Sequence, residues 1–167
     1  MQGFIASTMP PEQAIPILQS ALEAATETEP TMVGPLASML NWSMVDDRQA
    51  ATVADALLDQ AGMTDEDYLV WYGRSLAAKG RLLAARGEQT DATDLASRAT
   101  DLLADTDFLL ARADAQIVSV EVAVLGGRAP DRRLINGALQ ALESKQALLA
   151  IRRIRGWLQR LGVDAVV

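Results

Sequence analysis

Residues 69–103 read LVWYGRSLAAKGRLLAARGEQTDATDLASRATDLL, and this stretch decides the fold. Two helical patterns of apolar residues meet there at Gly87, and small residues recur at fixed offsets, namely Gly80, Gly87, Ala92, Ala96 and Ala99. Small side chains let two antiparallel helices approach closely, and a glycine just past a helix ends it in a left-handed conformation that other residues resist. The stretch therefore predicts a helix-turn-helix unit.

Apolar residues recur at spacings of three and four along the rest of the chain as well, which is the period of an amphipathic helix. Capping signals precede several of these stripes: Asp46 with Gln49, Thr64 with Asp67, Thr90 or Asp91, and Asp131. Pro16 predicts a kink in the first helix or a later start. We expect eight helices, over residues 10–25, 32–42, 46–62, 64–87, 90–103, 108–126, 131–145 and 145–162.

The expected arrangement is a single all-α domain over residues 1–167, with irregular helices in 1–62 and hairpins in 64–162. Gly87 and Gly126, which end two of the predicted helices, are 39 positions apart, a distance within the range of helical repeat families. A stacked array of antiparallel pairs is therefore favoured. A compact helical bundle is the alternative, because only the last two pairs show related spacing.

The composition agrees with helices and removes several kinds of chemistry. Half of the residues are hydrophobic but only 4% are aromatic, so Ala, Leu and Val must fill the core. The chain has no Cys and no His, which excludes disulfides and removes the commonest metal ligand and general base. No nucleophile and base stand at a catalytic spacing. We therefore expect no enzyme activity, no metal and no cofactor.

The charge is unevenly distributed along the chain. Residues 1–67 carry eleven Asp or Glu and one Arg, whereas residues 127–167 carry three Asp or Glu and eight Lys or Arg, within a net charge of −7. An acidic total argues against binding to a phosphate backbone, so no nucleic-acid partner is expected. No apolar run is long enough to span a bilayer and the start does not look like a signal peptide, so we expect no membrane partner and a cytoplasmic location.

Residues 71–115, WYGRSLAAKGRLLAARGEQTDATDLASRATDLLADTDFLLARADA, resemble the tetratricopeptide-like repeats found toward the C-termini of large bacterial signalling proteins. Those proteins include adenylate cyclase-like ATPases and multidomain transcriptional regulators. Residues 137–162, GALQALESKQALLAIRRIRGWLQRLG, look like the final pair of such an array. The resemblance implies hairpin repeats in a bacterial signalling or regulatory protein. The phosphate-binding loop of those ATPases is absent, so their catalysis is not implied.

Two departures from the repeat pattern lie in the third pair, which consists of the helices expected at 108–126 and 131–145. The turn at 126–130 is longer than usual, and Arg132 or Arg133 stands where a small residue is expected. These departures predict that this pair splays.

In this family the first helix of each pair lines a concave groove. The resemblance implies that Arg74 and Arg81 face that groove, with Ala77 and Ala84 leaving room between them and Gln116 at the corresponding place on a later helix. Arginine forms forked hydrogen bonds to carboxylates, so an acidic peptide is the expected ligand. The alternative is that these are solvated surface residues.

Two further sets of residues are candidates. The last helix carries a basic face of Lys145, Arg152, Arg153, Arg155 and Arg160, which suits an acidic partner, the acidic N-terminal half, a second copy, or solvent alone. The aromatic residues Trp42, Trp71, Tyr72 and Trp157 suit either a pocket for a flat ligand or the core. The acidic run 65–67 is explained as a capped helix start and not as a metal site.

These observations favour a non-catalytic protein-protein interaction or scaffold module that binds a protein or peptide partner through a groove, and the candidate partner is acidic. A regulatory domain that binds a small ligand through its tryptophans is one alternative. A self-assembling adaptor, driven by the opposite charges of its ends, is the other.

Overall fold

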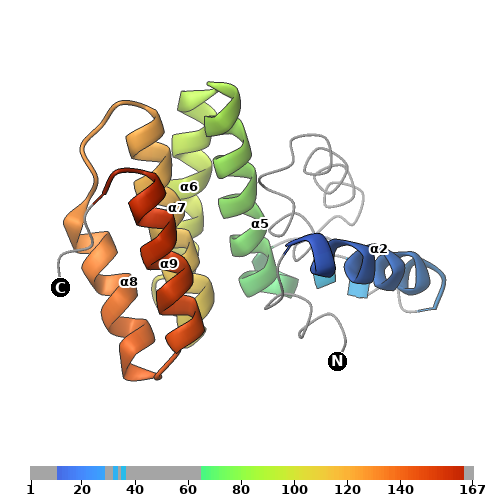
Figure 1. Ribbon diagram of the computed structural model, residues 1–167. Helices are drawn as coiled ribbons and strands as arrows, with labels where there is room; N and C mark the ends of the chain where they lie inside the picture. Colours follow the sequence, from blue (N-terminus) through green and yellow to red (C-terminus); the bar gives the residue numbers. More distant parts are fainter. Residues whose placement is uncertain (1–10, 29–31, 34, 37–64, 164–167) are drawn as a thin grey trace.

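The computed structural model describes residues 11–28, 32–33, 35–36 and 65–163, and every regular element in those ranges is helical. The elements are α2 (Pro11–Thr28), α5 (Asp65–Arg86), α6 (Gln89–Leu103), α7 (Leu109–Leu125), α8 (Arg132–Ser144) and α9 (Leu148–Arg160) (Figure 1). The all-α prediction is confirmed for this part of the chain. Most of the predicted helix at 32–42, the whole of the one at 46–62, and Trp42 lie outside the described residues.

The closest packing is between α5 and α6, where the small residues of the opening stretch meet. A Cβ placed on Gly80 would lie 3.0 Å from the carbonyl oxygen of Ala92 and 3.2 Å from the amide nitrogen of Ala96. Ala92, Ala96 and Ala99 are all buried. The predicted close approach is therefore present, and it depends on the missing side chain of Gly80.

Residues with a positive φ follow four of the helices, namely α5, α7, α8 and α9. Gly87 follows α5 with φ +85° and Gly162 follows α9 with φ +69°. In the turn after α7, Gly127 has φ +74°, whereas Gly126 does not have a positive φ. Gln146 takes the same conformation, with φ +54°, in the short turn between α8 and α9.

One helix start differs from expectation and two agree. The structure begins α6 at Gln89 after Glu88, without the side-chain cap predicted for Thr90 or Asp91. Gln89 instead donates a hydrogen bond from its side-chain amide to the carbonyl of Val122 at 2.6 Å, which ties α6 to α7. The first helix begins at Pro11, one residue from the expected start, and continues through Pro16, so the alternative of a later start was wrong. Asp131 caps α8 as predicted, accepting from the backbone amide of Arg133 at 2.8 Å.

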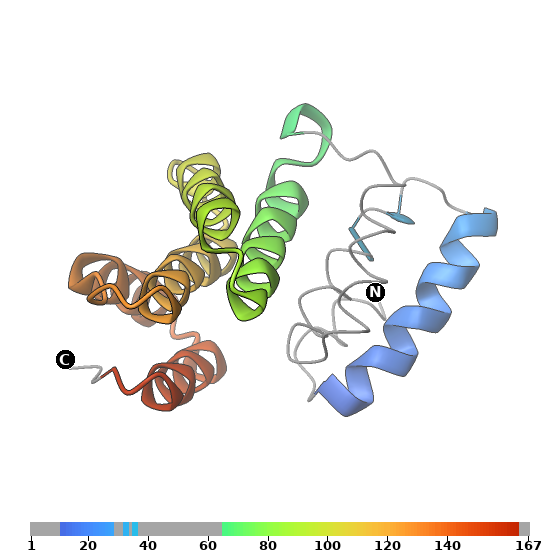
Figure 2. The same ribbon diagram turned by 90° about the horizontal axis from the view of Figure 1, so that it is seen from above.

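α7 is the central helix of the stack. It lies against α5, α6 and α8, and Figure 2 shows α5 and α9 on its two sides. α7 and α8 lie against each other across the long turn, but their backbones meet at fewer points than those of α5 and α6, and the splaying of this pair stays a prediction. The backbone of α9 approaches that of α8 at fewer points than the other neighbouring helices approach one another. Side chains therefore have a larger part in holding α9.

Candidate functional site

Two carboxylates lie on the buried surface of the central helix. Asp114 is fully buried and Glu121 nearly so, in a helix that is otherwise mostly apolar on several sides. They are seven residues apart, which places them two turns apart on the same face. A buried carboxylate is costly unless a cation and hydrogen bonds compensate it, so each must have a partner.

Asp114 lies between two arginines that come from opposite sides of α7. Arg74 on α5 is 3.6 Å from Asp114, measured from Nη2 to Oδ2, and Arg153 on α9 donates a hydrogen bond from Nη2 to Oδ1. Arg74 is 8% exposed, whereas the side chain of Arg153 is 38% exposed. Arg74, Asp114 and Arg153 are called the Asp114 cluster below.

Burial and charge act in opposite directions on this cluster. Burial raises the pKa of Asp114 because it disfavours the charged carboxylate, while the positive charges of Arg153 and Arg74 act to lower it. Burial also lowers the pKa of Arg74, and Asp114 opposes that shift. The net shift of the Asp114 pKa is upward, so burial outweighs the two arginines. The Oδ2 atom of Asp114 is also buried without a hydrogen-bond partner among the described residues.

A second cluster lies two turns along the same helices. The Nε of Arg81 on α5 is 2.6 Å from Oε2 of Glu121 on α7. The guanidinium carbon of Arg81 also lies 4.3 Å from the centroid of the Trp157 ring on α9, within cation–π distance. Arg81, Glu121 and Trp157 are called the Glu121 cluster below.

The two clusters change the interpretation of the predicted groove. Arg74 and Arg81 do bind carboxylates, but these carboxylates belong to α7 of the same chain instead of a bound peptide. Gln116, predicted at the corresponding place on α7, has its side-chain amide beside Gly137 on α8. Asp114 and Glu121 were not predicted as site residues. The available signal was their seven-residue spacing, which equals that of Arg74 and Arg81.

The basic residues of the last helix separate into paired and unpaired ones. Arg153 contacts Asp114, and Arg155 lies 3.3 Å from Glu143 of α8. Arg152 and Arg160 are exposed, and no carboxylate in the described ranges pairs with either. The outward side of α9 therefore presents cations that the neighbouring helices do not neutralise.

The three described aromatic residues from the predicted pocket each lie against a different arginine. Arg74 lies 5.8 Å from the centroid of Trp71, Arg98 lies 5.3 Å from that of Tyr72, and Arg81 covers Trp157. Trp157 is buried and the other two rings are partly buried. These contacts show arginine stacking at each ring, and a shared pocket for a flat ligand stays a prediction.

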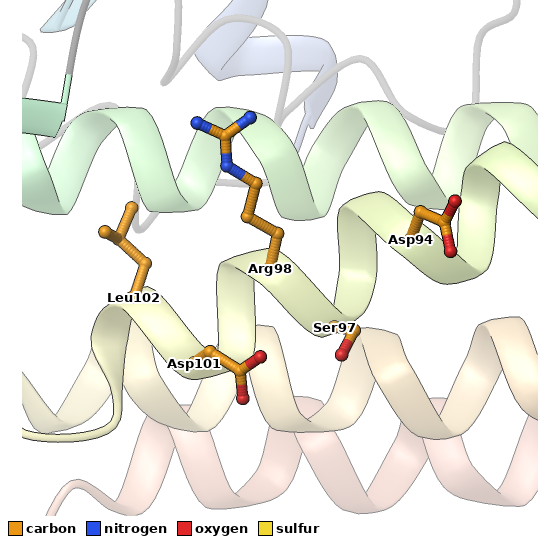
Figure 3. Close-up of a pocket in the computed structure, with 5 residues that line it drawn as sticks. All are labelled: Asp94, Ser97, Arg98, Asp101 and Leu102. Atoms are coloured by element: carbon orange, nitrogen blue, oxygen red, sulfur yellow. The ribbon is translucent and has the colours of Figure 1, made fainter.

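A shallow depression of about 420 Å³ lies on the outer side of α6. Figure 3 shows its lining residues, Asp94, Ser97, Arg98, Asp101 and Leu102, all of which come from that helix. Arg98 extends over α5, where it contacts Tyr72 (Figure 3). Asp94 and Asp101 are both exposed and leave the rim acidic.

Within the described ranges, no three residues of the metal-binding types are grouped so that they could hold an ion. No described helix has the length and apolar content needed to cross a bilayer. Comparisons with protein-family models, with curated proteins and with solved structures found no match to this chain.

Proposed function

We propose that the chain is a non-catalytic protein-interaction module, built from tetratricopeptide-like hairpins, of the kind found in bacterial signalling and regulatory proteins. The successive antiparallel helices from α5 to α9 support this proposal, because such stacks bind partners through shape and charge. The expected ligand is an acidic protein or peptide.

The observation that carries the proposal is the outward surface of α9. Leu148 and Leu149 are 64% and 74% exposed, and Arg152 lies one turn further along the same helix without an ion pair in the described part of the chain. Exposed leucines beside unpaired cations suit a partner that offers both apolar and acidic side chains. The opposite side of α9 packs into the core through Ile151, Ile154, Trp157 and Leu158, so the outward surface is held in place.

In this proposal Arg74 and Arg81, which the sequence predicted to bind a partner in a groove, have a structural role instead. Arg74 and Arg81 hold α5 against α7, and Arg153 and Trp157 extend the same two clusters to α9. The clusters therefore position the helix that carries the contact surface. An acidic partner binds on α9 and does not need to displace Asp114 or Glu121.

Affinity capture from the native cell tests this function. The intact chain is compared with Arg152→Glu plus Arg160→Glu and with the control Arg133→Glu, an exposed residue on α8. A direct partner, purified and titrated against each form, should bind the intact chain and the control equally. The double variant should lose at least tenfold in affinity, and the remaining binding should no longer weaken with salt. Equal binding by all three proteins would overturn the proposal.

A further inference from the structure

The outer side of α6 is the acidic counterpart of the basic outer side of α9. Residues 88–107 carry six Asp or Glu and one Arg, and all six carboxylates are exposed. Residues 127–163 carry eight Lys or Arg and two Asp or Glu. The described part of one chain thus holds two surfaces of opposite sign.

The depression on α6 gives this acidic surface a shape as well as a charge. Asp94 and Asp101 stand seven residues apart on its rim, and Leu102 supplies an apolar wall. Figure 3 shows Leu102 directed toward α5 and the two carboxylates standing apart along the helix. An incoming surface that combines leucine and arginine side chains would match this lining.

The α9 outer face, defined as Leu148, Leu149, Arg152, Gly156 and Arg160, has these properties. Helical spacing places Gly156 between Arg152 and Arg160 on one side of the helix. A Cβ on Gly156 would meet only the far end of the Arg160 side chain, at 4.0 Å. Glycine weakens the interior of a helix, and packing within this chain does not require it there. Its place suits the close approach of a helix from another molecule.

The two surfaces cannot meet within one chain. Figures 1 and 2 show α6 and α9 on opposite sides of α7, with α6 behind and α9 in front in the first view. A contact between the two surfaces therefore joins two copies in a heterologous, head-to-tail manner, and the resulting pair keeps one surface of each sign unused. Such a contact repeats from copy to copy.

We infer that the acidic partner of the α9 outer face is the α6 depression of a second copy of this chain. The inference rests on the proposed function, since it requires that the α9 outer face be a contact surface. It assigns to the protein a salt-sensitive, head-to-tail self-association.

Charge-swap variants of the full chain test the inference. The first variant is Asp94→Lys plus Asp101→Lys, the second is Arg152→Glu plus Arg160→Glu, and Arg133→Glu is the control. Molar mass is measured by light scattering over a range of protein concentrations at low and high salt. At low salt the intact chain and the control should reach at least twice the mass of one 17.9 kDa chain, and at high salt they should return to it.

Each double variant alone should remain a monomer at low salt, and an equimolar mixture of the two should associate again. The mixture restores one contact of the original polarity and one of reversed polarity. Gly156→Leu should also give a monomer, because its side chain separates the two helices. Circular dichroism confirms that each exposed substitution keeps the helical fold.

Three results overturn the inference: an intact chain that is monomeric at every concentration, double variants that associate as well as the intact chain, or a mixture that stays monomeric. The proposed function is judged separately. If the chain is monomeric but the α9 variant still loses a captured protein, only the inference fails. If the α9 variant changes neither self-association nor capture, both fail.

Discussion

The guanidinium carbon of Arg81 on α5 lies 4.3 Å from the ring centroid of Trp157 on α9, although α7 lies between the two helices. The same arginine holds Glu121 on α7. One side chain thus connects three helices, and it does so where α9 has little backbone contact with the stack. The position of the last helix, and of its outer face, depends on this contact and on Arg153 in the Asp114 cluster.

Replacing Trp157 with Ala should therefore be severe. The ring is buried, so its loss leaves a cavity and removes the cation–π contact with Arg81, and we expect the free energy of unfolding to fall by about 3–5 kcal/mol. Trp157→Phe keeps an aromatic face for Arg81 and should lose clearly less. Urea unfolding followed by circular dichroism measures both. If Phe proved as damaging as Ala, the stacking contact would have no part in stability.

The two arginines of the Asp114 cluster should differ in importance. Arg74→Met removes a buried partner and leaves the carboxylate of Asp114 poorly compensated, which costs about 3–5 kcal/mol in comparable buried pairs. Arg153→Met should cost less because water can reach that side of the pair, where the arginine is 38% exposed. The same denaturation experiment compares them. An equal loss for both variants would show that exposure does not set their contributions.

The pH dependence of stability should show the raised pKa of Asp114. Burial raises this pKa above that of the unfolded chain, so between the two values the folded protein keeps a proton that the unfolded chain has lost. The stability that this group contributes is complete below the unfolded value of about 3.9 and is lost as the pH rises through the folded value. Asn at position 114 would bind no proton in this pH range, so the variant Asp114→Asn is the reference for this effect.

Relative to Asp114→Asn, the intact chain should therefore lose free energy of unfolding as the pH rises from about 4 through the raised pKa. Unfolding curves of both proteins at matched pH values give this difference directly, and effects of all other groups cancel in it. A difference that stays constant would mean that the arginines balance burial at this carboxylate, and one that grows with pH would mean that they outweigh it.

The sequence predicted the ends of the described helices well where a residue at the end itself determines them. α5 and α9 stop at Gly87 and Gly162 because only glycine adopts those positive φ angles readily, and Asp131 caps α8 through its own carboxylate. The start of α6 was missed because it depends on a distant contact, from Gln89 to the carbonyl of Val122. The apolar spacing also extends to Leu125 at the end of α7 and to Leu148 at the start of α9, although both side chains are exposed.

The candidate site was harder to predict than the fold. Arg74 and Arg81 hold carboxylates of their own chain, whereas the sequence led us to expect the carboxylates of a bound peptide. A search for apolar stripes assumes that every Asp and Glu is solvated. Asp114 and Glu121 were therefore assigned no role, although they are the partners. Which charges in a helix are buried depends on how many neighbours surround it, and α7 has neighbours on several sides. Tertiary packing of this kind has no local signature.

Two glycines in helix interiors should respond oppositely to Ala. At Gly80 the new Cβ would lie 3.0 Å from the backbone oxygen of Ala92, and backbone atoms of a packed helix do not move aside easily. We expect Gly80→Ala to lower the free energy of unfolding by about 1–3 kcal/mol, since overpacking outweighs the gain in helix propensity. At Gly156 the Cβ enters open space, so Gly156→Ala should raise the free energy of unfolding by about 0.5–1 kcal/mol.

The two substitutions are chemically identical and both lie within helices, so each serves as the control for the other. Thermal and urea unfolding of the two variants beside the intact chain supply the measurement, at a protein concentration and salt that keep the chain monomeric. A stabilising Gly80→Ala would show that α5 and α6 are not in the close contact described above. A destabilising Gly156→Ala would mean that packing within one chain already requires the glycine, and the reason for assigning it to a contact with another molecule would be lost.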